Sequence, residues 1–432
     1  MSSTEKPSGL AKAIAAIFLG NALEIFDFTL FSFFAPIIGR LFFPSASPVA
    51  SLLLAVATFG VGFLARVPGG IVMGRLADRR GRKAAMILTI TMMGIGTAVV
   101  GLAPGYATLG VAAPLLLVAG RLLQGFSAGG EVGPSTAWLA EAGPAGSRNL
   151  LVSLQIASQA AAILAAALCG LLMNRLLSPA ELESWGWRVP FLVGLLIGPV
   201  GMMLRYSLPE THAGQVRTKA GRAVAAATPR VDWRALLVCT GAISGGAATM
   251  HLVILFMPTY LVHFVQLPPA VAFLSTCAST FTIMVATPTI ATLADRYGWR
   301  PKPLMMISVL LIIGAAYPAF HVLAQAPSLG MAIGVTTLLS FALSMLSAVG
   351  MPLLCEQFPS GSRAFGVGTA YNVAVCIFGG FSQLVATWLI NASHDLAAPA
   401  WYLMACGVLS FAGCWFMSPV DRPYRAANAE II

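Results

Sequence analysis

Long apolar runs follow one another along this chain and are separated by short polar segments. A helix needs about 20 apolar residues to cross the hydrocarbon core of a bilayer, and these runs are about that long or longer and do not alternate with period two. The pattern therefore predicts an all-α membrane protein with twelve membrane-spanning helices. The expected spans lie near residues 12–39, 48–74, 84–103, 112–139, 151–176, 189–207, 235–264, 270–293, 303–323, 329–354, 365–391 and 400–417.

Composition agrees with lipid as the main solvent of the chain. Of its 432 residues, 58% are hydrophobic and only 9% are charged, whereas about a quarter of an ordinary globular domain is charged. The seven cysteines form no CxxC pair, so we expect no disulfide framework, metal site or cofactor. The first apolar run is too long for a signal peptide and is expected to be the first span.

Positive charge is distributed unequally between the two sides of the predicted bundle. Of the 25 Lys and Arg residues, 20 fall in segments on the side of the termini, three in opposite loops, and two, Arg66 and Arg121, inside spans. The positive-inside rule then places both termini in the cytoplasm, in a bacterial inner membrane. The net charge of +10 is therefore a topology signal, and we expect no nucleic-acid partner.

Two polar motifs occur once in each half of the chain. The motif Leu-Ala-Asp-Arg-x-Gly around Asp78 recurs around Asp295, at an offset of 295 − 78 = 217 residues. The motif Glu-x-x-Pro-x-Gly-Ser-Arg that begins at Glu141 recurs at Glu356, at an offset of 356 − 141 = 215 residues. This repetition predicts two pseudo-symmetric six-helix bundles with a site between them.

The longest polar stretch, Pro209–Arg234, has no apolar period and is expected to be the cytoplasmic linker between the bundles. The expected domains are therefore residues 1–208, 209–234 and 235–432. We expect the protein to be a monomer.

The repeated motifs lie at cytoplasmic helix ends, where a carboxylate can pair with a guanidinium group or with a helix N-terminus. A contact of this kind that forms in one conformation only biases a rocking equilibrium between the bundles. The alternative is that these residues only set the topology. The expected gating residues are Gly74, Asp78, Arg79, Gly81, Arg82, Glu141, Arg148, Asp295, Arg296, Glu356 and Arg363.

Five charged side chains, Glu24, Asp27, Arg66, Arg121 and Glu131, lie well inside predicted spans, where a charge is costly and indicates function. Glu24 and Asp27 are spaced i,i+3 and share one helical face. Two neighbouring carboxylates at low dielectric resist double ionisation, which suits a proton carrier. The alternative is permanent neutralisation by Arg66 or Arg121. Glu131 is expected to pair with a cation or to take part in proton coupling.

Arg121 lies near the middle of its span and cannot realistically lose its proton, so it is the first candidate for binding an anion. An internal ion pair is the alternative, and Arg66 is expected to contact substrate or to belong to a gate. His251 is the only histidine well inside a predicted span, and a lone histidine is more often a packing residue than a site residue. Polar side chains complete the expected substrate site: Asn21, Gln124, Gln155, Gln159, His251, Tyr371 and Asn372.

The segment Gly74-x-Leu-Ala-Asp-Arg-x-Gly-Arg-Lys resembles the signature loop of the major facilitator superfamily, and Arg121-Leu-Leu-Gln-Gly resembles its fourth-helix motif. Leu208–Thr211 resembles the usual end of the first half in that superfamily. The Gly-x-x-x-Gly-Pro pattern of its antiporters does not occur in the fifth predicted span. The resemblance implies two six-helix bundles that expose one site alternately to the two sides.

A narrower resemblance is to the metabolite–proton symporters of this superfamily. It rests on residues 21–28, 62–70, 120–131, 185–191, 371–372 and 378–380, which cover both halves. Within that branch the chain is most similar to citrate and tricarballylate transporters, although Ile25 and Gln383 depart from the usual pattern. The resemblance implies symport of a carboxylate with protons, sodium not being excluded, but betaine and proline carriers share most of these segments.

We therefore expect a secondary active transporter and not an enzyme. Its expected activity is the proton-coupled import of a small di- or tricarboxylate such as citrate or tricarballylate, with Arg121 holding the anion and Glu24 or Asp27 the proton. Symport of a zwitterionic osmolyte is the alternative. A membrane-embedded sensor or enzyme would need a further soluble domain or a nucleophile–base motif, and neither is recognisable.

Overall fold

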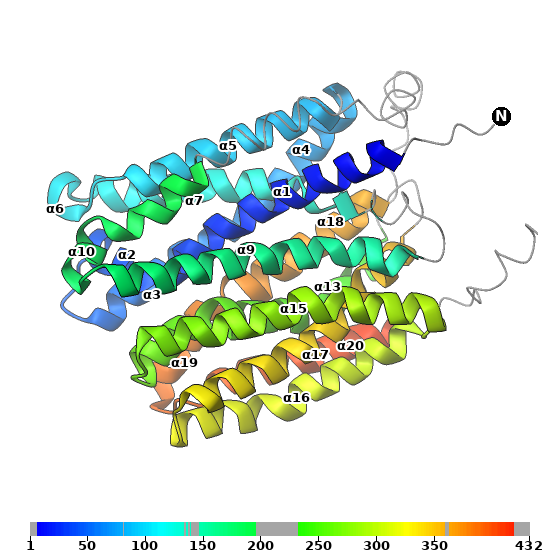
Figure 1. Ribbon diagram of the computed structural model, residues 1–432. Helices are drawn as coiled ribbons and strands as arrows, with labels where there is room; N and C mark the ends of the chain where they lie inside the picture. Colours follow the sequence, from blue (N-terminus) through cyan, green and yellow to red (C-terminus); the bar gives the residue numbers. More distant parts are fainter. Residues whose placement is uncertain are drawn as a thin grey trace, which may run out of the picture.

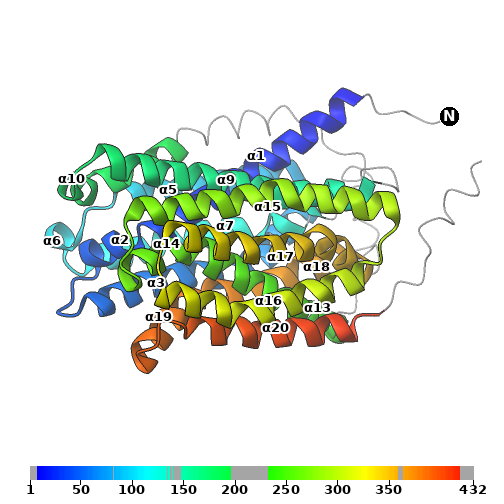
Figure 2. The ribbon, with the colours of Figure 1, turned by 60° about the horizontal axis from the view of Figure 1, so that its bottom comes forward.

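The computed structural model of the chain describes residues 7–80, 82–133, 135–136, 139, 147–195, 232–358 and 363–418. All regular elements within these residues are helices. The long helices run roughly parallel, with α1, α4, α5 and α7 on one side of the molecule and α16, α17 and α20 on the other. Between these groups, α9 packs along α15, as both views show (Figures 1 and 2).

The helices of the first half begin and end at defined residues. They are α1 (Pro7–Phe33), α2 (Ala35–Phe42), α3 (Pro48–Leu64), α4 (Arg66–Arg80), α5 (Arg82–Leu102), α6 (Tyr106–Leu109), α7 (Ala112–Gly129), α9 (Arg148–Leu176), α10 (Pro179–Ser184) and the 3₁₀ turn η2 (Gly186–Arg188).

The second half contains both α-helices and wider π-helical segments. Its α-helices are α13 (Trp233–Thr249), α14 (Met257–Thr259), α15 (Pro269–Tyr297), α16 (Pro301–Gln325), α17 (Leu329–Glu356), α18 (Arg363–Ala374), α19 (Ser382–Ser393) and α20 (Pro399–Phe416). Its π-helical segments are η3 (Met250–Phe256), η4 (Tyr260–Phe264) and η5 (Val375–Gly380).

The described part of the chain agrees with the predicted spans. Nine of its helices are long and apolar enough to cross a membrane, and a tenth span consists of the bent pair Phe18–Phe33 and Ala35–Phe42. The third predicted span corresponds to a shorter apolar helix, Ile87–Leu102. The sixth begins as a helix at residues 189–195, and the rest of it lies outside the described residues, as does most of the predicted linker.

The first span bends by 65° between its two helices. Phe34 leaves the helical conformation with φ −94° and ψ 8°, and Pro36 lies in the first turn of α2. Proline suits the first turn of a helix, where its missing N–H needs no partner. The bend therefore follows from a proline three residues after the end of α1.

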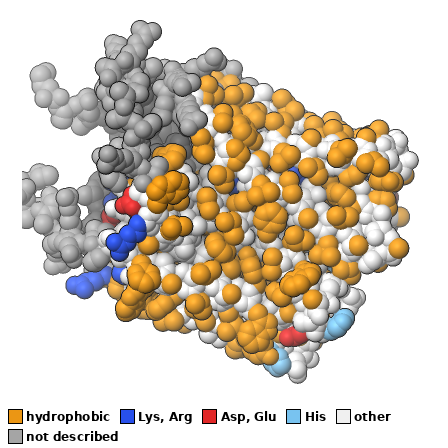
Figure 3. All heavy atoms as spheres, turned by 180° about the vertical axis from the view of Figure 1, so that it is seen from behind, with side chains coloured by type: hydrophobic (Ala, Val, Ile, Leu, Met, Phe, Trp, Pro, Cys, Tyr) orange, Lys and Arg blue, Asp and Glu red, His pale blue; other side chains and the backbone are white. Residues whose placement is uncertain are grey.

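The outer surface suits a lipid environment. Hydrophobic side chains cover the face seen in Figure 3, and charged side chains gather mainly at its two ends. Large apolar side chains such as Leu115, Leu237 and Trp415 are 66%, 70% and 61% exposed. In water this exposure would be unfavourable, whereas hydrocarbon solvates these groups well. The prediction of an all-α membrane protein is confirmed.

Glycines allow the backbones of α3 and α4 to touch that of α7. A Cβ at Gly125 would lie 1.7 Å from the carbonyl oxygen of Gly62, and a Cβ at Gly129 would lie 1.9 Å from that of Arg66. Small residues at such crossings are how helices pack in lipid, where burial of apolar area gives little driving force. This contact places the backbone of Arg66 directly against α7.

The two halves meet through charged groups at the end of the molecule where α9 begins and α15 ends. Arg148 at the start of α9 donates from Nη1 to Oε1 of Glu356 at 2.7 Å. The Asp295 carboxylate, near the end of α15, accepts from the backbone N–H groups of Asn149 and Leu150 at 3.3 and 3.0 Å, and from Asn149 Nδ2 at 2.8 Å. The carboxylate thus binds free N–H groups in the first turn of α9.

Replacing Gly125 tests the contact between α3 and α7. Gly125→Ala puts a methyl group on the backbone of Gly62, and we expect destabilisation of about 1–3 kcal/mol or more, since backbone yields less than a side chain. The matched control is Gly94→Ala, where a Cβ meets no atom within 4 Å. Thermal unfolding of the purified variants should show a lower midpoint for Gly125→Ala only. Equal midpoints would contradict the packing described.

Replacing Asp295 tests the contact between α15 and α9. Asp295→Ala removes the acceptor for three N–H groups that begin α9, so we expect the two halves to separate more often at this end. The readout is the labelling rate of Ser347→Cys, a cavity position, after replacement of the native cysteines. Asp395→Ala is the control, because the hydrogen bond that its carboxylate accepts among the described residues lies within its own loop, from Ala397 N–H at 2.8 Å. Labelling should rise severalfold for Asp295→Ala alone; an unchanged rate would refute the gate.

Candidate functional site

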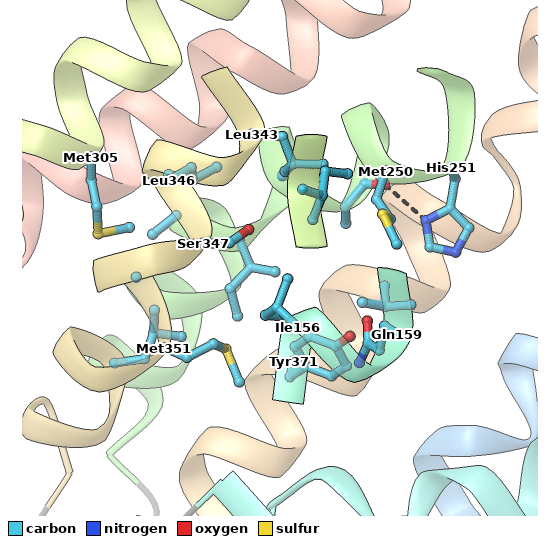
Figure 4. Close-up of a pocket in the computed structure, with 18 residues that line it drawn as sticks. Ile156, Gln159, Met250, His251, Met305, Leu343, Leu346, Ser347, Met351 and Tyr371 are labelled. Carbon is cyan, nitrogen blue, oxygen red and sulfur yellow. Dashed lines mark hydrogen bonds between the residues drawn. The ribbon is translucent and has the colours of Figure 1, made fainter. Parts of the chain in front are cut away.

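A cavity of about 90 Å³ lies between α9 and the helices of the second half (Figure 4). One end is polar and is formed by Gln159, His251 and Tyr371, three residues that the sequence predicted for substrate binding. The other end is apolar and includes Met305 and Met351. The residues that line it include no Asp, Glu, Lys or Arg, so the charged groups of the site lie behind its polar end.

A buried ion pair lies next to that polar end. Arg66 Nη2 donates to Glu24 Oε1 at 2.8 Å, and the two side chains are 3% and 4% exposed. The ring of Phe63 lies 5.3 Å from the guanidinium carbon of Arg66, and its centroid lies 5.3 Å from that of the His251 ring. One aromatic ring therefore separates the ion pair from His251, and Arg66 interacts electrostatically with both His251 and Tyr371.

The second carboxylate on this face of α1 is joined to an arginine through an amide. Arg121 Nη1 donates to Gln124 Oε1 at 2.8 Å, and Gln124 Nε2 donates to Asp27 Oδ2. The ion pairs found among the described residues do not include one between Arg121 and Asp27. Arginine thus compensates the two carboxylates in different ways. Glu24 contacts Arg66 directly, whereas Asp27 is joined to Arg121 through Gln124.

Aromatic rings surround the Arg121 guanidinium. Its central carbon lies 4.2 Å from the centroid of Phe28, 4.4 Å from that of Phe31 and 5.5 Å from that of Phe59. Cation–π contacts of this kind stabilise a desolvated charge. Arg121 is fully buried, and its Nε and Nη2 have no hydrogen-bond partner in the described part of the chain. It therefore keeps donors that a bound anion could use after a rearrangement.

Asn21 and Gln155 join helices within the first half. Asn21 Nδ2 donates to the carbonyl of Gln155 at 3.0 Å and to Ser158 Oγ at 2.7 Å, which ties α1 to α9. Gln155 Oε1 accepts from Thr136 at 2.8 Å. The polar groups of these two residues are thus engaged inside the bundle, while Gln159, one turn further along α9, lines the cavity.

The second half contributes His251 and Asn372 in different ways. The Nδ1–H of His251 donates to the Ala247 carbonyl at 2.8 Å, as Figure 4 shows, which leaves Nε2 as an acceptor. Its ring lies against Gly379, where a Cβ would approach to 2.7 Å. Asn372 Nδ2 donates to the Gly129 carbonyl at 2.9 Å. Asn372 therefore links the two halves, whereas Tyr371 beside it faces the cavity.

A second, smaller pocket brings two predicted proton-coupling residues together. Glu24 and Glu131 both line it, together with Thr89, Met93 and Ser127, between α1, α5 and the end of α7. It does not share a lining residue with the larger cavity. Glu24 and Glu131 thus line a pocket that is separate from the larger cavity.

The predicted gating residues are only partly described. Arg148, Asp295 and Glu356 make the contacts between the halves given above, Arg363 Nε donates to the Cys355 carbonyl at 2.8 Å, and the Arg296 guanidinium lies 5.8 Å from the Tyr297 ring. Their counterparts in the first half lie outside the described residues or side chains; they are Gly74, Asp78, Arg79, Gly81, Arg82 and Glu141.

Sequence reasoning did not single out the groups that hold Arg121 and Asp27 in place. These are the rings of Phe28, Phe31 and Phe59 and the hydroxyl of Thr97, which accepts from Gln124 at 3.2 Å. Phe28 and Phe31 are spaced i,i+3, so they share a face, and that spacing was an available signal. Thr97 gave no signal, because its position in α5 is set by tertiary packing.

Comparison with known proteins places this geometry in a family. The sugar (and other) transporter family matches residues 12–228. A citrate-proton symporter of Klebsiella pneumoniae is 38% identical, with 92% of this chain and 90% of the relative covered. A proline/betaine transporter of Salmonella typhimurium is 34% identical, with 97% and 86% covered.

A solved structure supports the same conclusion at the level of the fold. The partially occluded inward-open xylose transporter XylE of Escherichia coli superposes with a TM-score of 0.76 at 19% identity, with 96% of this chain and 99% of that chain covered. The same transporter in another solved structure is described as a major facilitator superfamily protein, so this chain has the fold of that superfamily. With relatives above 30% identical along nearly the whole chain and a family model that matches half of it, the protein belongs to the sugar (and other) transporter family, and it is a transporter and not an enzyme.

Proposed function

We propose that the protein imports a small di- or tricarboxylate, such as citrate or tricarballylate, together with protons. The observation that carries this proposal is the buried Arg66–Glu24 ion pair, one aromatic ring away from the polar end of the cavity. A guanidinium group that already holds a carboxylate can exchange it for another of the same geometry. The ion pair is therefore a site at which substrate and protein carboxylates compete.

Competition between the substrate carboxylate and Glu24 for Arg66 would couple substrate binding to proton uptake. A substrate carboxylate that reaches Arg66 from the side of His251 weakens its contact with Glu24, which lies 2.8 Å away. A carboxylate at 4% exposure is costly to keep ionised as that contact weakens, so binding of the anion favours protonation of Glu24. Asp27, joined to Arg121 through Gln124, is the second candidate proton carrier.

The charges near the cavity favour an anion over a zwitterion. The cavity contains no acidic lining residue and only one aromatic ring, Tyr371, that could hold a quaternary ammonium group. Arg66 and Arg121 lie behind its polar end. The citrate-proton symporter among the relatives agrees with an anionic substrate, while the proline/betaine transporter represents the alternative.

Alternating access would follow from rocking of the two bundles, proposed as residues 1–208 and 235–432. The contacts of Arg148 with Glu356 and of Asp295 with α9 form the cytoplasmic gate in this proposal. We place the protein in a bacterial inner membrane with both termini in the cytoplasm, because most basic residues lie in segments on the same side of the membrane as the termini.

Uptake into proteoliposomes tests the function itself. With an inward proton gradient, labelled citrate should accumulate, and excess tricarballylate should suppress the accumulation because it competes for the same guanidinium group. Glycine betaine should leave it unchanged. Uptake of citrate that ignores the proton gradient would reject proton coupling, and inhibition by betaine but not by tricarballylate would favour the zwitterion carrier.

Glu24→Gln tests the exchange at Arg66. Glutamine imitates a protonated glutamate, so we expect the variant to exchange labelled for unlabelled citrate but to lose accumulation driven by the proton gradient, by tenfold or more. Glu183→Gln is the matched control, because Glu183 also pairs with an arginine, Arg40, at 2.9 Å, but with side chains 40% and 45% exposed. That control should accumulate normally. A Glu24→Gln variant that accumulates like the wild type removes Glu24 from the coupling step.

A further inference from the structure

Gln124 has each end of its amide bound to a different charged group. Its Oε1 accepts from Arg121 Nη1 at 2.8 Å, while its Nε2 donates to Asp27 Oδ2 and to Thr97 Oγ1, the latter at 3.2 Å. Thr97 uses its own hydrogen for the Met93 carbonyl at 3.0 Å, so its oxygen is available as an acceptor. The fully buried amide therefore makes hydrogen bonds on both sides.

The chemistry of the partners fixes which way this amide points. A guanidinium group only donates hydrogen bonds, and an ionised carboxylate only accepts them. Oε1 must therefore face Arg121, and the NH₂ group must face Asp27. In this orientation Gln124 occupies the space between an acid on α1 and a base on α7, both at most 2% exposed.

The neighbouring pair Glu24 and Arg66 has no residue between its charged groups. Glu24, one turn before Asp27 on α1, is in direct contact with Arg66 at 2.8 Å. A guanidinium in direct contact holds a carboxylate in its ionised form far more strongly than a neutral amide does. Arg121 tolerates the lack of a direct carboxylate partner because Phe28 and Phe31 lie 4.2 and 4.4 Å from its guanidinium carbon.

We propose that Gln124 is a positioning residue that keeps Asp27 and Arg121 out of direct contact, and thereby keeps Asp27 able to take up and release a proton. Arg121 retains its charge among the aromatic rings and senses the state of Asp27 through the amide. The inference rests on the proposed function, in which Asp27 is a candidate proton carrier. It assigns Gln124 to proton coupling, whereas the sequence suggested a contact with substrate.

Other ionisable groups near this unit are accounted for by partners of their own. Glu24 on α1 contacts Arg66 on α4, and Arg66 in turn acts electrostatically on Arg121. His251 on η3 donates to the Ala247 carbonyl. The charged group that acts on Asp27 is Arg121, and α5 contributes the neutral hydroxyl of Thr97.

Two substitutions of Gln124 separate spacing from hydrogen bonding. Gln124→Ala removes the spacer, so Arg121 and Asp27 can pair directly, and the pH at which Asp27 is half protonated should fall by about one unit or more. Gln124→Met keeps the bulk but removes the donor to the carboxylate, and the same midpoint should rise. The opposite signs are the signature of a spacer, since a merely structural role would not produce them.

The measurement uses the full-length protein in liposomes and needs no substrate. Infrared spectra recorded over a pH titration follow the carbonyl band of protonated carboxylic acids, and the part of the band that Asp27→Asn removes belongs to Asp27. Gln383→Ala is the control, because Gln383 is also fully buried but donates to Ser32 Oγ at 2.7 Å, away from Arg121. Its midpoint should equal that of the wild type.

The outcomes separate this inference from the proposed function. Midpoints that move in the same direction for Ala and Met, or that do not move, overturn the role of Gln124. If Gln124→Ala does not fold, Gln124→Asn takes its place, because the shorter amide cannot reach both partners and should also lower the midpoint. If the wild type shows no Asp27 band, Asp27 is not the proton carrier and the inference is rejected. Citrate uptake driven by a proton gradient is measured independently, so this result does not decide the proposed function.

Discussion

Two guanidinium groups are buried inside a bundle that lipid surrounds, and the cost of their desolvation determines how the first half is arranged. Arg66 meets this cost with a direct carboxylate partner, Glu24. Arg121 meets it with aromatic rings and the oxygen of Gln124. Because each charge is compensated in a different way, the two arginines are suited to different tasks: one to exchange its carboxylate and the other to stay charged while a nearby acid titrates.

The glycine contacts connect these charges to the interface between the two halves. The backbone of Arg66 lies on α7 at Gly129, and the carbonyl of Gly129 also accepts from Asn372 of the second half. Arg66 thus lies against Gly129, and Gly129 contacts Asn372 across the interface between the two halves. The Asp295 carboxylate contacts the start of α9 across the same interface. Both of these contacts join a short side chain of the second half to backbone groups of the first half.

Hydropathy was enough to predict the spans and the family motifs were enough to predict the fold, because lipid imposes both length and helicity on every segment. The intramembrane charges also singled out residues that the structure buries between α1, α4 and α7, and their roles in a site stay predictions. Spacing alone could not decide which carboxylate meets which arginine: Glu24 and Asp27 share a face, and only the packing of α4 and α7 selects Arg66 for the first and Gln124 for the second. Likewise, nothing local distinguishes Asn372, which binds a backbone carbonyl, from Tyr371, which faces the cavity.

The π-helical segments of the second half have a mechanical consequence. A π turn holds one residue more than an α turn, so moving the wide turn along a helix rotates each residue it passes by about 100° while most backbone hydrogen bonds are kept. His251 belongs to η3 and lies against Gly379 of η5. The histidine ring can therefore be turned toward or away from the cavity by torsion of two neighbouring helices, without a hinge and without unfolding.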